Sequence, residues 1–110
     1  MKNSYKIKII QRAREDLDNI YRYISSELYA EYAAENLLER IEKSIMRLKD
    51  FPISCNYVAD EFLRKKGYRK LIVNNYIVFY LVNEEEKQVV IMRVKLFLIA
   101  FLLRKCLWKK

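Results

Sequence analysis

The chain has 110 residues, of which 53% are hydrophobic and 14% aromatic, and its formal net charge is +8. This length and composition exclude a disordered chain and predict one compact domain with a core of its own. Because the sequence has no histidine and two cysteines, it excludes a histidine general base, a disulfide framework and a four-ligand zinc site. We therefore expect no metal and no cofactor.

No export or membrane segment is evident in the sequence. The N-terminal residues contain no apolar run of signal-peptide length. The most apolar stretch, Leu96–Leu103, has eight residues, whereas a membrane span needs about 20. We expect a protein of the reducing cytoplasm without a membrane partner.

The first half of the chain predicts a strand followed by a helical hairpin. Residues 5–9 alternate apolar and basic side chains, and this period of two predicts a half-buried strand. Apolar residues then recur at steps of three and four, first over 13–28 and again over 34–48, which is the spacing of amphipathic helices. We place the break between the helices near 25–30, and Pro52 ends the second helix.

The second half predicts three strands. Residues 53–66 show no sustained period and predict a loop, after which 68–73 predict a strand and Asn74-Asn75 a turn. Residues 76–82 are continuously apolar, as in a central strand covered on both faces, and 89–94 form a further strand. The order β-α-α-β-β-β predicts an α+β fold, with the helical hairpin packed on one face of a small, mainly antiparallel sheet.

Charge is distributed unevenly along the chain. Residues 15–63 contain eleven acidic and five basic residues, whereas 1–14, 64–83 and 95–110 contain five basic residues each and no acidic ones. Basic segments of this kind bind nucleic acid or an acidic partner, or serve solubility. The helical carboxylates favour a solvated face over a general-acid pair; they are Glu15, Asp16, Asp18, Glu31, Glu35, Glu39 and Glu42.

A basic and aromatic cluster precedes and enters the second predicted strand. It consists of Arg64, Lys65, Lys66, Tyr68, Arg69 and Lys70. Such a set can hold phosphates or stack a base, it can meet the carboxylates of an acidic protein, or it can be a solvated basic edge. Arg93 interrupts an apolar strand, so it should face solvent, pair with a carboxylate or serve a site. For Tyr76, Phe79 and Tyr80 we favour core packing.

Six segments form an ordered set along the chain. They are 13–17 (AREDL), 20–24 (IYRYI), 33–41 (AAENLLERI), 48–52 (LKDFP), 67–80 (GYRKLIVNNYIVFY) and 90–94 (VIMRV). No single segment is specific, but the ordered set resembles the RelE/ParE superfamily of type II toxin–antitoxin toxins. The resemblance runs from about residue 5 to residue 94.

The resemblance implies a small cytoplasmic toxin with the fold predicted above. It also implies a cognate antitoxin that wraps the toxin with an extended or helical segment, in a heterodimer or heterotetramer. RelE-like members of the superfamily cleave mRNA on the ribosome, whereas ParE-like members inhibit DNA gyrase. Candidate contacts with target or antitoxin are Arg64, Lys65, Lys66, Tyr68, Arg69, Lys70 and Arg93.

Residue identity favours the ParE-like branch and a binding toxin rather than an enzyme. RNA cleavage without metal or histidine needs cations that stabilise the phosphorane charge and a group that activates the 2′-hydroxyl. RelE-like members tend to carry arginine where this chain has Ile72 and Ile77. If the protein is nonetheless a metal-independent endoribonuclease, its phosphate and transition-state contacts would be Arg69, Lys70 and Arg93.

The end of the chain departs from the resemblance. We therefore divide the chain into a toxin-like domain, 1–94, and a divergent apolar and basic tail, 95–110. The tail reflects either a frameshifted or truncated gene, or a terminal element that packs on the sheet or on a partner. A third functional hypothesis follows, an inactive remnant that keeps the fold and still binds antitoxin.

Overall fold

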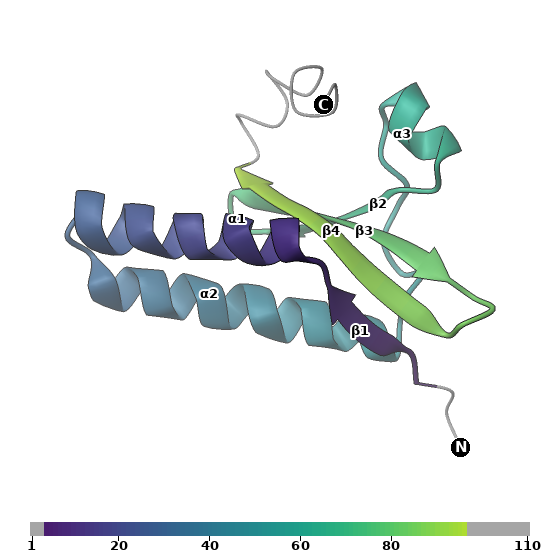
Figure 1. Cartoon of the computed structure of the whole chain (residues 1–110), viewed down its shortest axis with the longest axis horizontal. Helices are drawn as coiled ribbons and strands as arrows, with labels where there is room; N and C mark the ends of the chain where they lie inside the picture. The colour runs from purple at the N-terminus through teal and green to yellow at the C-terminus, as the bar shows by residue number, and fades with distance from the viewer. Residues whose placement is uncertain (1–3, 97–110) are drawn as a thin grey trace.

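The computed structural model describes residues 4–96 and confirms the predicted α+β fold (Figure 1). Two long antiparallel helices lie on one face of a four-stranded sheet, and a short helix stands on the other side. The elements are β1 (Lys6–Ile9), α1 (Gln11–Arg22), the π-helical turn η1 (Tyr23–Glu27), α2 (Glu31–Met46), the 3₁₀ turn η2 (Arg47–Lys49), α3 (Glu61–Lys65), β2 (Arg69–Val73), β3 (Tyr76–Asn83) and β4 (Gln88–Leu96).

The sheet has the strand order β1-β4-β3-β2, in which β1 runs parallel to β4 and the other pairs are antiparallel. The predicted turn between β2 and β3 is confirmed, and Asn74 takes the left-handed conformation there with φ 55°. Pairing of β1 with β4 ends at Ile91, so within residues 4–96 no strand pairs with the last residues of β4 on that side. The predicted tail boundary at residue 95 falls inside β4, and its residues 97–110 lie outside the described residues.

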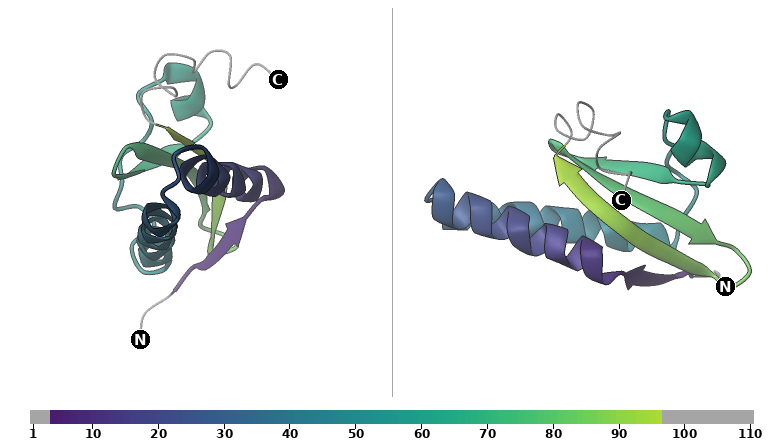
Figure 2. Two further views of the ribbon diagram at one scale, coloured as in Figure 1. Left: turned by 90° about the vertical axis from the view of Figure 1, so that its left-hand side faces the viewer. Right: turned by 45° about the horizontal axis from the view of Figure 1, so that its top comes forward.

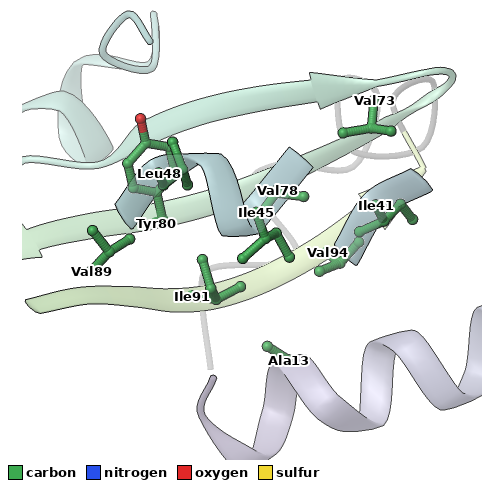
Figure 3. Packing of buried hydrophobic residues seen from close by; sticks show 10 residues of the cluster. All are labelled: Ala13, Ile41, Ile45, Leu48, Val73, Val78, Tyr80, Val89, Ile91 and Val94. Atoms are coloured by element: carbon green, nitrogen blue, oxygen red, sulfur yellow. The ribbon is translucent and has the colours of Figure 1, made fainter. Parts of the chain in front are cut away.

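The main core lies between the sheet and the helical hairpin (Figure 3). It combines one face of β3 and β4 with the apolar stripe of α2, as period-two and helical spacing predict. Tyr80 is fully buried and Phe79 is 5% exposed, which confirms core packing for both, and Tyr76 is half-buried. The ten buried members are Ala13, Ile41, Ile45, Leu48, Val73, Val78, Tyr80, Val89, Ile91 and Val94.

A second, smaller cluster covers the opposite face of β3, formed by Val58, Leu63, Tyr68, Ile77 and Phe79. It depends on α3, and the prediction of a loop over 53–66 is wrong there. The carboxylate of Asp60 accepts the Leu63 N–H at the start of α3. At its end, Gly67 with φ 90° and the bond from Tyr68 N–H to Leu63 O (3.1 Å) form a Schellman motif. A helix of five residues is too short to show a helical period.

The helical hairpin extends past the end of the sheet (Figures 1 and 2). The first helical segment, α1 followed by η1, ends at Glu27, and α2 begins at Glu31. The break between the helices therefore lies inside the predicted range 25–30. No glycine is present there, and Tyr29 itself takes the left-handed conformation with φ 51°. Among the described residues, none of the helices has the length and apolar character needed to cross a membrane.

Candidate interaction site

Arg93 lies in an ion-pair network that joins β4 to α1. Its guanidinium contacts both carboxylate oxygens of Asp16, with Nε 2.9 Å from Oδ2 and Nη2 3.2 Å from Oδ1. The same carboxylate accepts the Val94 N–H at 2.9 Å, and Lys95 Nζ lies 3.4 Å away. Asp16 is 8% exposed, so the prediction that it belongs to a solvated helical face is wrong. Of the alternatives open for Arg93, pairing with a carboxylate is confirmed.

The position of Asp16 follows from the shape of the sheet. Beyond Ile91 no strand in the described part of the chain pairs with this edge of β4, and α1 packs against it instead. The Asp16 carboxylate accepts the Val94 N–H that a further strand would have accepted. Burial by itself raises the pKa of Asp16, but the hydrogen bonds from Arg93 and Val94 and the charges of Lys95 and Arg93 outweigh it. The pKa of Asp16 therefore lies below its usual value.

Arg69, another predicted contact residue, is also held by internal contacts. Its Nη1 donates to the carbonyl of Cys55 at 2.7 Å, and its guanidinium lies over the Tyr57 ring, 4.0 Å from the centroid. Tyr57 also forms a β-bridge with Arg69. Through these contacts Arg69 links the segment that contains Cys55 and Tyr57 to the start of β2.

The rest of the predicted basic cluster divides between α3 and β2. Arg64, Lys65 and Lys66 lie exposed on and just after α3, where Lys66 stands over the Phe62 ring at 4.7 Å. Lys65 lies 4.0 Å from Glu61 in an exposed pair. Tyr68 is 8% exposed inside the second cluster, and burial raises its pKa.

Lys70 and Arg93 lie on different strands of the sheet. Both are in register with Phe79, Lys70 from β2 and Arg93 from β4, so that β3 separates them. Of the three predicted phosphate contacts, Arg69 and Arg93 thus have separate partners within the protein, and Lys70 and Arg93 lie on opposite sides of β3.

Tyr80 is placed for structure rather than proton transfer. Its hydroxyl donates to the carbonyl of Pro52 at 3.1 Å, and burial, with Cys55 close by, raises its pKa above the usual range. Among residues 4–96, no three side chains of the types His, Cys, Asp and Glu lie together as metal ligands would.

The outer edge of β2 is a feature that the sequence did not reveal. Residues 56–58 pair with the beginning of β2, through bonds from Lys70 N–H to Asn56 O and from Val58 N–H to Tyr68 O. In a strand, the backbone N–H and C=O of every second residue point to the same side. Because the Lys70 N–H points away from β3, the Lys70 carbonyl and the N–H and carbonyl of Ile72 do so as well. The Ile72 side chain is 54% exposed at this edge.

A cavity of about 360 Å³ adjoins this edge. Its lining includes apolar side chains and the Arg47 cation, and Arg40 of α2 donates to the Asn74 side chain, just after β2, at 3.5 Å. Its lining is Ser44, Arg47, Leu48, Phe51, Ser54, Cys55 and Leu71. The edge and the cavity together form a surface that can receive an extended peptide, with backbone bonds along β2 and one apolar side chain in the cavity.

Comparisons with known proteins agree with this architecture. A family model described as ParE toxin of type II toxin-antitoxin system, parDE, matches residues 7–95. No curated protein sequence matches the chain. The chromosomal ParDE toxin–antitoxin system from P. aeruginosa is similar in structure, with 20% identity and a TM-score of 0.70 over 86% of this chain and 98% of that chain.

Two RelE-type structures are similar as well. The RelBE2 toxin–antitoxin complex from Mycobacterium tuberculosis is 19% identical, with a TM-score of 0.64 over 84% of this chain and 91% of that chain. A mutant of the E. coli toxin RelE in the free state is 16% identical, with a TM-score of 0.59 over 84% and 82%. These identities show a common fold, and the family model covers most of the chain. The chain therefore belongs to the ParE toxin family of type II toxin–antitoxin systems, within the RelE/ParE superfamily.

Proposed function

We propose that the protein is a growth-inhibiting toxin that binds DNA gyrase without cleaving nucleic acid, and that a cognate antitoxin neutralises it. Membership of the ParE family supports the toxin role. The choice of a binding toxin rests on one observation, which is that two predicted contact arginines are held by partners within the protein. Arg93 is held by Asp16, and Arg69 is held by the Cys55 carbonyl and the Tyr57 ring.

A ribonuclease of this fold would need cations free to contact a scissile phosphate. In this chain Arg69 and Arg93 stabilise the protein itself, and the positions of Ile72 and Ile77 are apolar. Tyr80, which pairs with Arg69 in the sheet, is buried with its hydroxyl bonded to the Pro52 carbonyl. These arrangements favour binding over RNA cleavage.

The test compares two activities of one purified preparation. We expect the protein to block supercoiling of relaxed plasmid by gyrase and to leave mRNA intact on translating ribosomes. Codon-linked mRNA cuts with normal supercoiling would overturn the proposal in favour of the RelE-like activity. A folded protein that binds antitoxin and affects neither reaction would instead be an inactive remnant.

For the antitoxin, we propose that an extended segment with apolar and acidic side chains pairs along the open edge of β2. The Ile72 backbone groups supply the hydrogen bonds, and the adjoining cavity receives an apolar side chain. Lys70 lies in β2, Arg47 lines the adjoining cavity and Arg40 bonds the Asn74 side chain just after β2. Their positive charge suits carboxylates on the partner. Two of the similar structures, those from P. aeruginosa and Mycobacterium tuberculosis, are described as a toxin–antitoxin system and a toxin–antitoxin complex.

Replacing Ile72 by glutamate is expected to weaken antitoxin binding at least about tenfold. The substitution removes an apolar contact, and the new carboxylate repels an acidic partner. The matched control is Phe62→Glu, since Phe62 is similarly exposed (57% against 54%) but lies on α3. Calorimetric titration of each variant with co-purified antitoxin measures the effect. Equal loss in both variants would mean that charge in general, and not this edge, controls binding.

A further inference from the structure

The connection between α1 and α2 exposes large apolar side chains that the core does not use. Within ten positions, four such residues are more than half exposed, whereas most other large apolar residues within 4–96 lie in the two clusters or pack against them. We call them the hairpin tip: Tyr23 (56%), Leu28 (55%), Tyr29 (92%) and Tyr32 (78%). A group of this kind on a soluble protein typically marks an interaction surface.

The hairpin tip is well placed to meet another macromolecule. The hairpin carries the connection between α1 and α2 beyond the end of the sheet, as two views show (Figures 1 and 2). Tyr29 occupies a left-handed position in the reversal, a conformation that costs a non-glycine residue about 1 kcal/mol or more. No buried contact accounts for a tyrosine there, because its side chain is 92% exposed.

The charge of this region is opposite in sign to the net charge of the chain. Residues 23–38 contain Glu27, Glu31 and Glu35 and no lysine or arginine, although the chain as a whole carries +8. All three glutamates are exposed. The hairpin tip is therefore an acidic surface with tyrosines, whereas α3 and the β2 edge are basic.

We infer that the hairpin tip is the surface with which the toxin docks on a basic face of its protein target. Arginine and lysine side chains fit such a surface, since they stack on tyrosine rings and pair with carboxylates. Tyrosines also make up many of the residues that dominate binding energy at interfaces. This inference rests on the proposed function, because gyrase acts on DNA and must present a basic DNA-binding surface.

The test uses a double variant, Tyr29→Asn with Tyr32→Ser, in the full-length protein. Asparagine tolerates the left-handed conformation, and both side chains are more than three-quarters exposed, so the variant should fold with an unchanged melting temperature. The matched control is Phe62→Ser, which removes an exposed aromatic side chain from α3. We expect affinity for gyrase, measured by surface plasmon resonance, to fall at least about tenfold in the double variant and to stay unchanged in the control.

Each other outcome overturns a distinct statement. If the wild-type protein does not bind gyrase, the proposed function fails and the docking inference fails with it. If the wild-type protein binds and the double variant binds equally well, the docking inference alone is wrong. If the double variant instead loses self-association in sedimentation and keeps its affinity for gyrase, the hairpin tip is a contact between copies of the chain, and the inference is again wrong.

Discussion

Replacing Asp16 by alanine is expected to lower the free energy of unfolding by about 3–5 kcal/mol, the typical effect of removing one partner of a buried ion pair. The substitution leaves the Arg93 side chain, 12% exposed, without its carboxylate, and it leaves the Val94 N–H without an acceptor. Urea denaturation followed by circular dichroism measures the change. The matched control is Asp18→Ala on the exposed side of α1, which should change stability by less than about 0.5 kcal/mol.

A second variant separates loss of the pair from loss of packing. In Asp16→Ala with Arg93→Met, both charges are gone and an apolar side chain of similar length fills the space, so much of the lost stability should return. If the double variant is no more stable than Asp16→Ala, the uncompensated Arg93 charge is not the cause of the destabilisation.

The same pair predicts how stability depends on pH. The pKa of Asp16 is lower in the folded protein than its usual value of 3.8, so the folded state binds this proton less readily than the unfolded state does. The stabilisation is present above that usual value and is lost as the pH falls through the lower, folded pKa. Below about pH 4, stability should therefore fall more steeply in the wild-type protein than in Asp16→Asn.

The ion pair also determines what a loss of activity in an Arg93→Ala variant would mean. In a nuclease, Arg93→Ala would abolish cleavage in a folded protein. Here the same substitution leaves Asp16 buried without its guanidinium partner, so loss of toxicity is expected to accompany a lower melting temperature. Toxicity lost with an unchanged melting temperature would contradict this and would return Arg93 to the list of target contacts.

The fold could be predicted from the sequence because its signals are local. Period two in residues 5–9, the two helical stripes and the Asn74-Asn75 turn each reflect chemistry within a few residues. The ion pair is not local, because Asp16 and Arg93 are 77 positions apart. A signal did exist: Asp16 follows Ala13 by three residues and so lies on the apolar stripe, whereas Asp18 does not. A carboxylate on such a stripe needs a partner, and Arg93 in an apolar strand needs one too.

Other features carried no usable signal. Five residues of α3 are fewer than two helical turns, so their period cannot be seen. The alternation in β2 is the same for an edge strand and for an inner one, and the strand order decides which of the two it is. The exposure of the hairpin tip likewise depends on how far the hairpin extends past the sheet, which no local pattern specifies.

Replacing Tyr80 by alanine should be comparably damaging, with a loss of about 3–5 kcal/mol, because it empties a fully buried aromatic site in the main core (Figure 3). Tyr80→Phe keeps the ring and removes the bond to the Pro52 carbonyl, so it should cost about 1 kcal/mol. Tyr32→Ala, at a site 78% exposed, is the control for loss of an aromatic side chain and should be nearly neutral.

Tyr80→Phe also distinguishes a structural tyrosine from one that acts on a ligand. Its hydroxyl is turned toward Pro52 and its pKa is raised by burial, so gyrase inhibition by Tyr80→Phe should match that of the wild-type protein once the folded fraction is taken into account. If this variant keeps its stability and loses inhibition, the hydroxyl contacts the target and the structural role is wrong. If it loses both in proportion, Tyr80 acts through the loop that it holds, the segment from Pro52 to Tyr57 on which Arg69 also depends.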